Sequence, residues 1–145
     1  LTSNAPMPAA NFTIDGISAC LGNDFNLDGS SSTNTDQYLW FLTGTGATPT
    51  YDTDEGLNGT LTPTITGTNQ EITLLAGGGC RTDGVFTTVD VFNPVAASVS
   101  TTNTTCGSNN GAINITSPSG GSGTYSYSID NGSSFQSSGD CCRYL

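Results

Sequence analysis

The sequence contains no histidine and no lysine, and charged residues make up only 10% of its 145 residues. Without histidine, the imidazole base that activates a serine or cysteine nucleophile near neutral pH is missing. Without lysine, the chain can form neither a Schiff base nor a lysine isopeptide crosslink, and it has no phosphate-binding P-loop. These absences exclude the most familiar catalytic arrangements, and we expect a protein that is not an enzyme.

Positive charge is nearly absent as well. Arg81 and Arg143 are the only cations against 12 carboxylates, which gives a net charge of −10 at pH 7. Such a chain repels nucleic acid and anionic lipid surfaces. The sequence also has no apolar run that approaches the ~20 residues of a membrane-spanning helix. We therefore expect no nucleic-acid partner and no membrane insertion.

The polar residues that are present are mostly uncharged, and the chain contains five cysteines. The cysteines lack the spacing of a metal site, and with no histidine beside them they predict disulfide bonds formed in an oxidising compartment. An extracellular or cell-surface location is therefore expected. The cysteines are Cys20, Cys80, Cys106, Cys141 and Cys142.

Short alternating runs separated by Gly, Asn, Asp and Pro predict an all-β protein. Residues 1–10, with two prolines, are expected to form a linker. Residues 11–93 are expected to form an antiparallel β-sandwich, and residues 94–145 a smaller β-domain near the lower size limit for independent folding. The expected strands are 12–14, 24–27, 37–42, 61–65, 71–76, 84–92, 96–101, 111–117 and 125–129.

The expected strand at 37–42 places Tyr38, Trp40 and Leu42 on one face, where they predict the core of the sandwich. Cys20 precedes the second expected strand and Cys80 follows the fifth. A bridge between them would staple the two sheets across Trp40 and would contribute roughly 4 kcal/mol on the chain-entropy model.

The remaining cysteines leave alternatives open, because Cys141 and Cys142 are adjacent and cannot both bond to Cys106. One of the two is expected to bridge Cys106. The other would remain free or would join two chains in a covalent fibre.

Alternating oxygen ligands at Asp24, Asn26 and Asp28 resemble the start of a calcium loop, but the twelfth position is Thr35 instead of a bidentate glutamate. A strand whose polar residues face solvent is the preferred interpretation, with calcium as the alternative. Asp52, Asp54 and Glu55 form a second acidic cluster. A solvated loop is again the preferred interpretation, with calcium as the alternative.

Two segments resemble known families. Phe25–Ser32, followed by Tyr38–Phe41, resembles the second and third strands of PKD-like domains, which are immunoglobulin-like β-sandwiches of bacterial surface proteins. The Gly-Asp-Gly that usually follows is replaced by Thr43–Gly46.

The second resemblance lies at Thr105–Gly107, Asn110–Ile113 and Gly120–Asp130, which are similar to the SprB-type repeat of Bacteroidetes surface adhesins. This similarity covers residues 95–135. The later Gly-Thr-Tyr strand and closing Gly-Cys of that family are absent, and Gly139–Leu145 stands in their place.

These resemblances imply spacer and adhesion modules in long proteins exported by the type IX secretion route. The expected function is a structural or adhesive segment of such a protein, in contact with neighbouring domains of the same chain. One alternative is a carbohydrate-binding accessory module of a secreted enzyme, with surface glycans as ligands. Another is a subunit of a self-assembling filament or homo-oligomer.

Overall fold

The computed structural model describes residues 6–43, 56–108 and 110–141. These residues form an all-β protein, as the alternating pattern predicts. They form no helix that is long and apolar enough to cross a membrane. The chain divides into two compact units, Leu1–Phe92 (unit 1) and Asn93–Leu145 (unit 2). The division falls one residue before the boundary expected at Asn93-Pro94.

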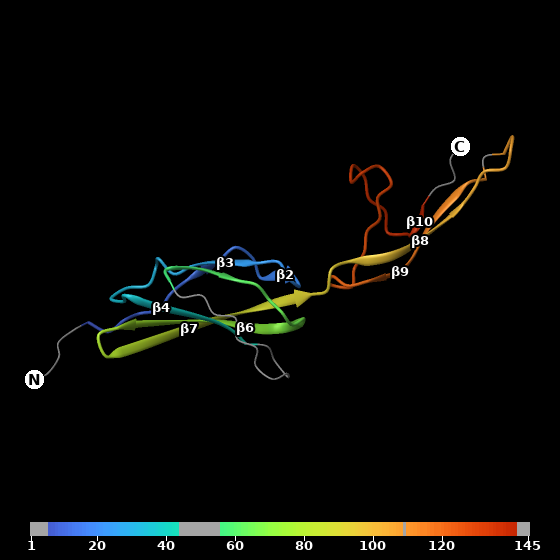
Figure 1. The fold of residues 1–145 in the computed structure, drawn as a ribbon. Helices are drawn as coiled ribbons and strands as arrows, with labels where there is room; N and C mark the ends of the chain where they lie inside the picture. The colour runs from blue at the N-terminus through green and yellow to red at the C-terminus, as the bar shows by residue number, and fades with distance from the viewer. Residues whose placement is uncertain (1–5, 44–55, 109, 142–145) are drawn as a thin grey trace, which may run out of the picture. The chain divides into compact units, whose positions relative to one another are not determined.

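Unit 1 is a β-sandwich of two sheets (Figure 1). One sheet has the strand order β1-β3-β5, and the other has the order β2-β7-β6-β4. The strands of unit 1 are β1 (Thr13–Ile14), β2 (Ser18–Cys20), β3 (Phe25–Asp28), β4 (Gln37–Thr43), β5 (Asn58–Leu61), β6 (Gly67–Gly78) and β7 (Arg81–Phe92).

The core lies between these sheets because alternate residues of each strand point inward. In β3, Phe25 and Leu27 are buried while Asn26 and Asp28 are exposed. Trp40 is fully buried, Leu42 is buried beside it, and Tyr38 is partly buried against the same cluster, which confirms the predicted core face. The other buried members of the core are Leu61, Ile72, Leu74, Val89 and Val91.

One pairing in the sandwich is parallel, whereas the sequence pattern predicts an antiparallel fold. The short strand β2 was not among the expected strands. It pairs in parallel with the end of β7, with Ser18 opposite Asp90 and Cys20 opposite Phe92. The backbone N–H of Leu21 extends this ladder by donating to the carbonyl of Phe92 at 2.7 Å. The N-terminal part of unit 1 is thereby tied to its last strand.

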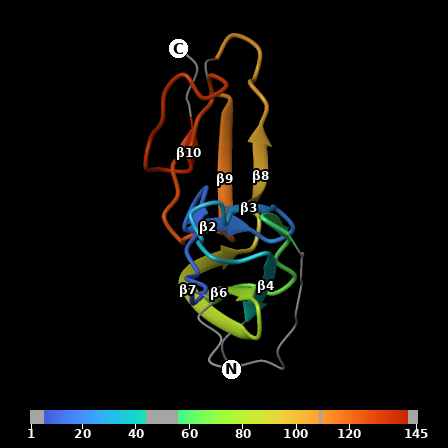
Figure 2. The same cartoon turned by 90° about the vertical axis from the view of Figure 1, so that its left-hand side faces the viewer.

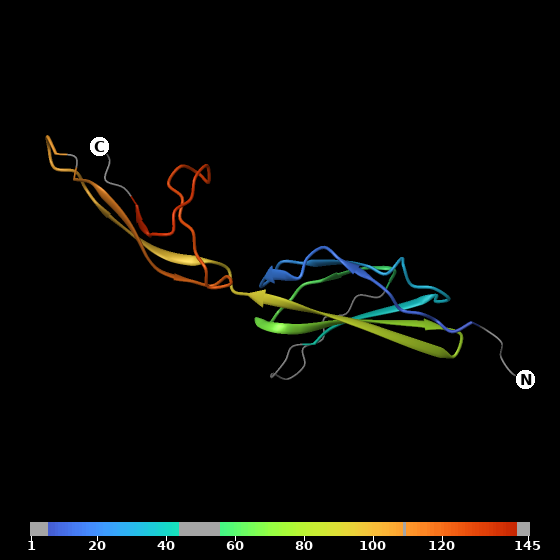
Figure 3. The same cartoon turned by 180° about the vertical axis from the view of Figure 1, so that it is seen from behind.

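The predicted disulfide between Cys20 and Cys80 is wrong, because both thiols are free. Cys20 lies opposite Phe92 at the end of β7, whereas Cys80 lies in the turn that precedes Arg81 at its beginning. The intervening strand is roughly 35 Å long at 3.2–3.4 Å per residue. Figure 3 shows β7 running from that turn to the end of the sandwich where β2 lies. A disulfide requires Cα atoms within about 7 Å, so the register forbids this bridge.

The N-terminal residues contribute more to unit 1 than a linker would. Ala9 forms a bridge with Thr33, and the backbone N–H of Ala10 donates to the carboxylate of Asp83 at 2.8 Å. Pro8 is buried. The linker predicted at residues 1–10 therefore ends before Pro8 in the described part of the chain.

Unit 2 is one antiparallel sheet with the strand order β10-β9-β8 (Figure 2). Val99 of β8 lies opposite Ile115 of the central strand β9, and Cys141 of β10 lies opposite Ile113 of β9. None of the described residues of this unit is buried. Its strands are β8 (Ala96–Thr102), β9 (Ala112–Ser119) and β10 (Asp140–Cys141).

Two of the expected strands are largely absent from the structure. The expected strand 125–129 is reduced to a single bridge between Tyr127 and Gln136. The expected strand 61–65 lies mostly beyond β5, which ends at Leu61. Asp130-Asn131-Gly132 forms a turn, with positive φ angles of 58° at Asn131 and 86° at Gly132.

Candidate functional site

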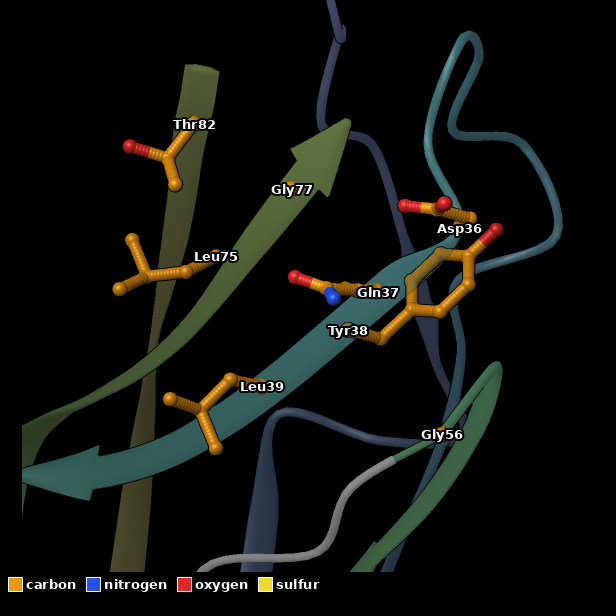
Figure 4. A pocket seen from close by; sticks show the side chains of 8 residues that line it. All are labelled: Asp36, Gln37, Tyr38, Leu39, Gly56, Leu75, Gly77 and Thr82. Carbon is orange, nitrogen blue, oxygen red and sulfur yellow. The ribbon is translucent and has the colours of Figure 1, made fainter. Parts of the chain in front are cut away.

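Unit 1 has a hollow on the outer face of the four-stranded sheet, with a volume of about 560 Å³. Its floor is formed by two rows of paired residues, in which Gln37 lies opposite Gly77 and Leu39 lies opposite Leu75. Figure 4 shows the side chains of Gln37, Leu39 and Leu75 along one side of the sheet. The residues that line the hollow are Asp36, Gln37, Tyr38, Leu39, Gly56, Leu75, Gly77 and Thr82.

The side chains that line the hollow are suited to binding a neutral polar ligand. Among the described residues that line it, Asp36 is the only carboxylate, and Gln37 and Thr82 supply an amide and a hydroxyl beside the two leucines. Polar groups that flank a small apolar floor can hold a neutral polar ligand such as a sugar. No imidazole or amine stands beside Asp36 to act with it as an acid–base pair, since the chain has neither histidine nor lysine.

Among the described residues of this face, Phe41 and Phe86 are separated by Thr73 in the register and do not lie on adjacent strands. Trp40 is completely buried, so its predicted role in the core is confirmed and its ring is not available to stack on a sugar. Phe86 is 62% exposed on β7, but its register partner on β6 is Thr73. A stacking platform would need aromatic rings side by side.

Two of the three predicted calcium ligands, Asn26 and Asp28, are exposed residues of β3, and Asp24 directly precedes that strand. Each of the three is engaged by other protein groups. Asp24 accepts a hydrogen bond from the hydroxyl of Thr62. The side-chain amide of Asn26 donates to Asp15 at 2.6 Å, and this bond lowers the pKa of the Asp15 carboxyl.

Asp28 is engaged in the same way, since the backbone N–H of Ser30 donates to it at 2.8 Å and lowers its pKa. In the described part of the chain, no three acidic or cysteine side chains come together as metal ligands. Calcium binding stays a prediction. The second acidic cluster, Asp52, Asp54 and Glu55, lies outside the described residues.

The remaining cysteines belong to unit 2. Cys106 is an exposed free thiol in the turn between β8 and β9, so its predicted bridge to Cys141 or Cys142 is not formed in this structure. Cys141 belongs to β10, and Cys142 lies outside the described residues.

Asp130 lies in a turn of unit 2, where its carboxylate accepts several hydrogen bonds. Its carboxylate accepts hydrogen bonds from the hydroxyl of Ser134, from the backbone N–H of Ser134 at 2.9 Å and from the hydroxyl of Ser128 at 2.7 Å. These donors lower the pKa of Asp130 from 3.8 to about 2. Because the folded-state pKa is depressed, this contribution to stability is complete above pH 3.8 and is lost as the pH falls through about 2.

We expect replacement of Ser134 by alanine to raise the pKa of Asp130 towards 3.8, because the first of these donors is removed. An NMR titration of the Asp130 carboxyl carbon measures this shift. Ser133→Ala is the matched control, since the Ser133 hydroxyl donates to the Asp130 backbone carbonyl and not to its carboxylate. Equal titration curves for the two variants would contradict this assignment.

The strand β8, at one edge of the unit 2 sheet, is the most exposed element of the described chain. All seven residues of β8 are exposed, and Val99 is 63% exposed. Sequence reasoning placed this strand correctly but did not single it out as a surface, because the strand pattern alone does not reveal which strand lies at the edge of a sheet.

The comparisons with known proteins concern this second unit. A search of curated proteins found no match to the chain. The family model of the SprB repeat matches residues 98–134, from within β8 through the Asp130 turn. The SprB repeat is a structural repeat of surface proteins and not a catalytic family, and it is typical of Bacteroidetes cell-surface proteins. Unit 2 therefore contains a SprB repeat, which indicates an adhesin-type region of a large cell-surface protein.

Proposed function

We propose that this chain is a spacer and contact segment of a long adhesin that is exported to the cell surface. The observation that carries the proposal is the SprB repeat at residues 98–134, which follows a β-sandwich in the same chain. Its partners are then the neighbouring domains of the same protein and the surface to which the cell attaches. The PKD-like character of unit 1 and export by the type IX route belong to this proposal.

The strand pairing of unit 1 supports a role under tension. Force applied through the two ends of the unit pulls β2 towards its beginning and β7 towards its end. Because these strands are parallel, the pull is a shear along their shared ladder from Ser18-Asp90 to Cys20-Phe92. All hydrogen bonds of that ladder must then fail together. Pairing of β2 with β7 therefore takes the mechanical role that was expected of a disulfide between Cys20 and Cys80.

The charge distribution supports display in solution. Unit 1 carries ten carboxylates against Arg81, a net charge of −9, whereas unit 2 carries Asp130 and Asp140 against Arg143, a net charge of −1. A strongly acidic sandwich stays soluble and repels other copies of itself. Contact is therefore more favourable through the nearly neutral repeat.

Surface display is the first expected result. Antibodies raised against residues 1–145 should label intact cells that produce the full protein, and mild protease treatment of those cells should remove the label. A cytoplasmic protein, detected in parallel, controls for broken cells. Labelling that appears only after the cells are made permeable would contradict the proposed function.

A second candidate is a carbohydrate-binding module, which the hollow at Asp36, Gln37 and Leu75 favours. Glycan-array binding by the chain, abolished by Gln37→Ala, would support that candidate. The same chain failing to bind any glycan while still labelling cell surfaces would leave the spacer role as the better explanation.

A further inference from the structure

The outer edge of β8 is unpaired in the described chain. The sheet has the order β10-β9-β8, so one side of β8 faces β9 and the other side faces no strand (Figure 2). Along an edge strand, every second residue points its backbone N–H and C=O away from the sheet. A strand of seven residues therefore offers a row of donors and acceptors to an incoming strand.

This edge lacks the features that normally prevent strand addition. Its sequence, Ala96–Thr102, has no charged residue and no proline. Proteins usually protect exposed edges with lysine, proline, a bulge or a very short strand. Three outer strands of unit 1, namely β1, β2 and β5, are protected by being only two to four residues long. The register shift between β8 and β9 lies between Ala96 and Ser98, but its extra residue is on β9, so the edge of β8 stays regular.

Unit 2 also leaves its apolar side chains uncovered. Val99 lies opposite Ile115, so both side chains are on one face of the sheet, and neither is buried. Ile129 is 49% exposed and Phe135 is 66% exposed. A three-stranded sheet of this kind gains stability from an additional strand, because side chains of the new strand pack beside those of β8 and remove apolar area from water.

We propose that β8 pairs in antiparallel fashion with β8 of a second copy of this chain. In the symmetric register, Val99 lies opposite Val99 of the second copy, Ser98 opposite Ser100, and Ala97 opposite Thr101. A two-fold axis through the Val99 pair keeps the same face of both sheets on the same side. The two three-stranded sheets then form one continuous sheet in which the Val99 and Ile115 side chains of both copies make an apolar row.

The distribution of charge favours a second copy of β8 as the partner strand. The strands β8 and β9 contain no charged residue, and unit 2 as a whole has a net charge of −1. Two copies of unit 2 can approach without appreciable repulsion. Unit 1, at −9, repels any acidic surface, including a second unit 1. The strand that β8 accepts is therefore another uncharged β8.

This pairing predicts a reversible dimer of the 14.8 kDa chain, independent of where the full protein is displayed. The full chain, kept reduced so that cysteines cannot crosslink copies, is measured by sedimentation velocity over a range of concentrations. The expected result is a shift from monomer to dimer as the concentration rises. A chain that stays monomeric at millimolar concentration would overturn the proposal.

Charge exchange at the self-opposed position tests the register. Val99→Asp and Val99→Lys should each weaken the dimer by about tenfold or more, because like charges lie opposite each other across the axis. A mixture of the two variants should form a mixed dimer at least as tight as the dimer of either variant alone, because the opposed charges then attract. Recovery in the mixture cannot come from unfolded protein, so it separates loss of pairing from loss of fold.

Phe86→Asp is the matched control, because Phe86 is 62% exposed but lies on β7, which is an inner strand of the unit 1 sheet. It should dimerise like the unaltered chain. If Phe86→Asp abolishes the dimer and Val99→Asp does not, the contact belongs to unit 1 and the β8 proposal is wrong. If the mixed Val99 variants recover nothing, the symmetric register is wrong.

Discussion

Replacement of Trp40 by alanine is expected to lower the free energy of unfolding of unit 1 by about 3–5 kcal/mol, the usual cost of removing a large buried aromatic side chain. A domain of this size is stable by only about 5–15 kcal/mol. The variant should therefore lose a large fraction of its free energy of unfolding.

The surroundings of Trp40 explain this cost. Its ring meets that of Phe12 edge to face, with 5.2 Å between the ring centroids. Its Nε1 donates a hydrogen bond to the carbonyl of Gly56 at 3.0 Å. Gly59 lies directly against the ring, and a Cβ at that position would be 2.9 Å from it. The alanine variant would lose the ring contacts, leave a carbonyl without its partner and open a cavity that the rigid sheets cannot fill.

Urea unfolding followed by circular dichroism measures the change. Phe86→Ala is the control, since its side chain is 62% exposed on the outer face of the same sheet and its removal should change the free energy by no more than about 0.5 kcal/mol. Equal losses in the two variants would mean that the core does not lie between the two sheets.

The sequence was sufficient to predict the core of unit 1 because strand alternation is a local property. Phe25 and Leu27 alternate with Asn26 and Asp28, and this order alone determines which side chains are buried. The all-β fold followed from the same kind of signal, whereas the expected division near Asn93 rested on the proline at the next position.

Pairing between distant strands could not be predicted in this way. Cys20 and Cys80 look like a disulfide when only strand order is considered, but the parallel register of β2 on β7 places them at opposite ends of a long strand. The strand β2 has three residues, too few for a periodic signal. The clearest alternating run, Tyr125 to Ile129, forms only one bridge, because no neighbouring strand is available along its length.

The candidate contact surfaces were equally out of reach for sequence reasoning. The hollow beside Gln37 depends on the register of Gln37 with Gly77, a glycine far along the chain that leaves the space open. The edge position of β8 depends on which strand pairs with β9 on its other side. Both features depend on which strands pair and in which register, and hydrophobic periodicity does not encode strand pairing.

Stretching the chain by its ends is expected to produce two separate unfolding steps of unequal strength. In unit 2, the two-residue β10 should detach first. Ala96 of β8 and Ser119 of β9 then lie side by side at the loaded end, so the remaining pairs open one at a time at low force. In unit 1, the β2–β7 ladder is loaded in shear and should resist to a higher force.

The strong step should release a length of roughly 250 Å, the extended length of the segment from Ser18 to Phe92. Leu21→Pro removes the N–H that bonds to Phe92, whereas Leu21→Ala removes the same side chain and retains the N–H. The proline variant should lower the force of the strong step well below that of the alanine variant. Similar forces for the two would show that the clamp lies elsewhere.

Single-molecule force spectroscopy of the full chain under reducing conditions tests most directly whether this segment is built to bear load. We expect a weak step from the SprB repeat, followed by a strong step from the sandwich that does not depend on any disulfide. A sandwich that extends at or below the force of the repeat, or that resists only when its cysteines are oxidised, would contradict a load-bearing spacer held by β2 and β7.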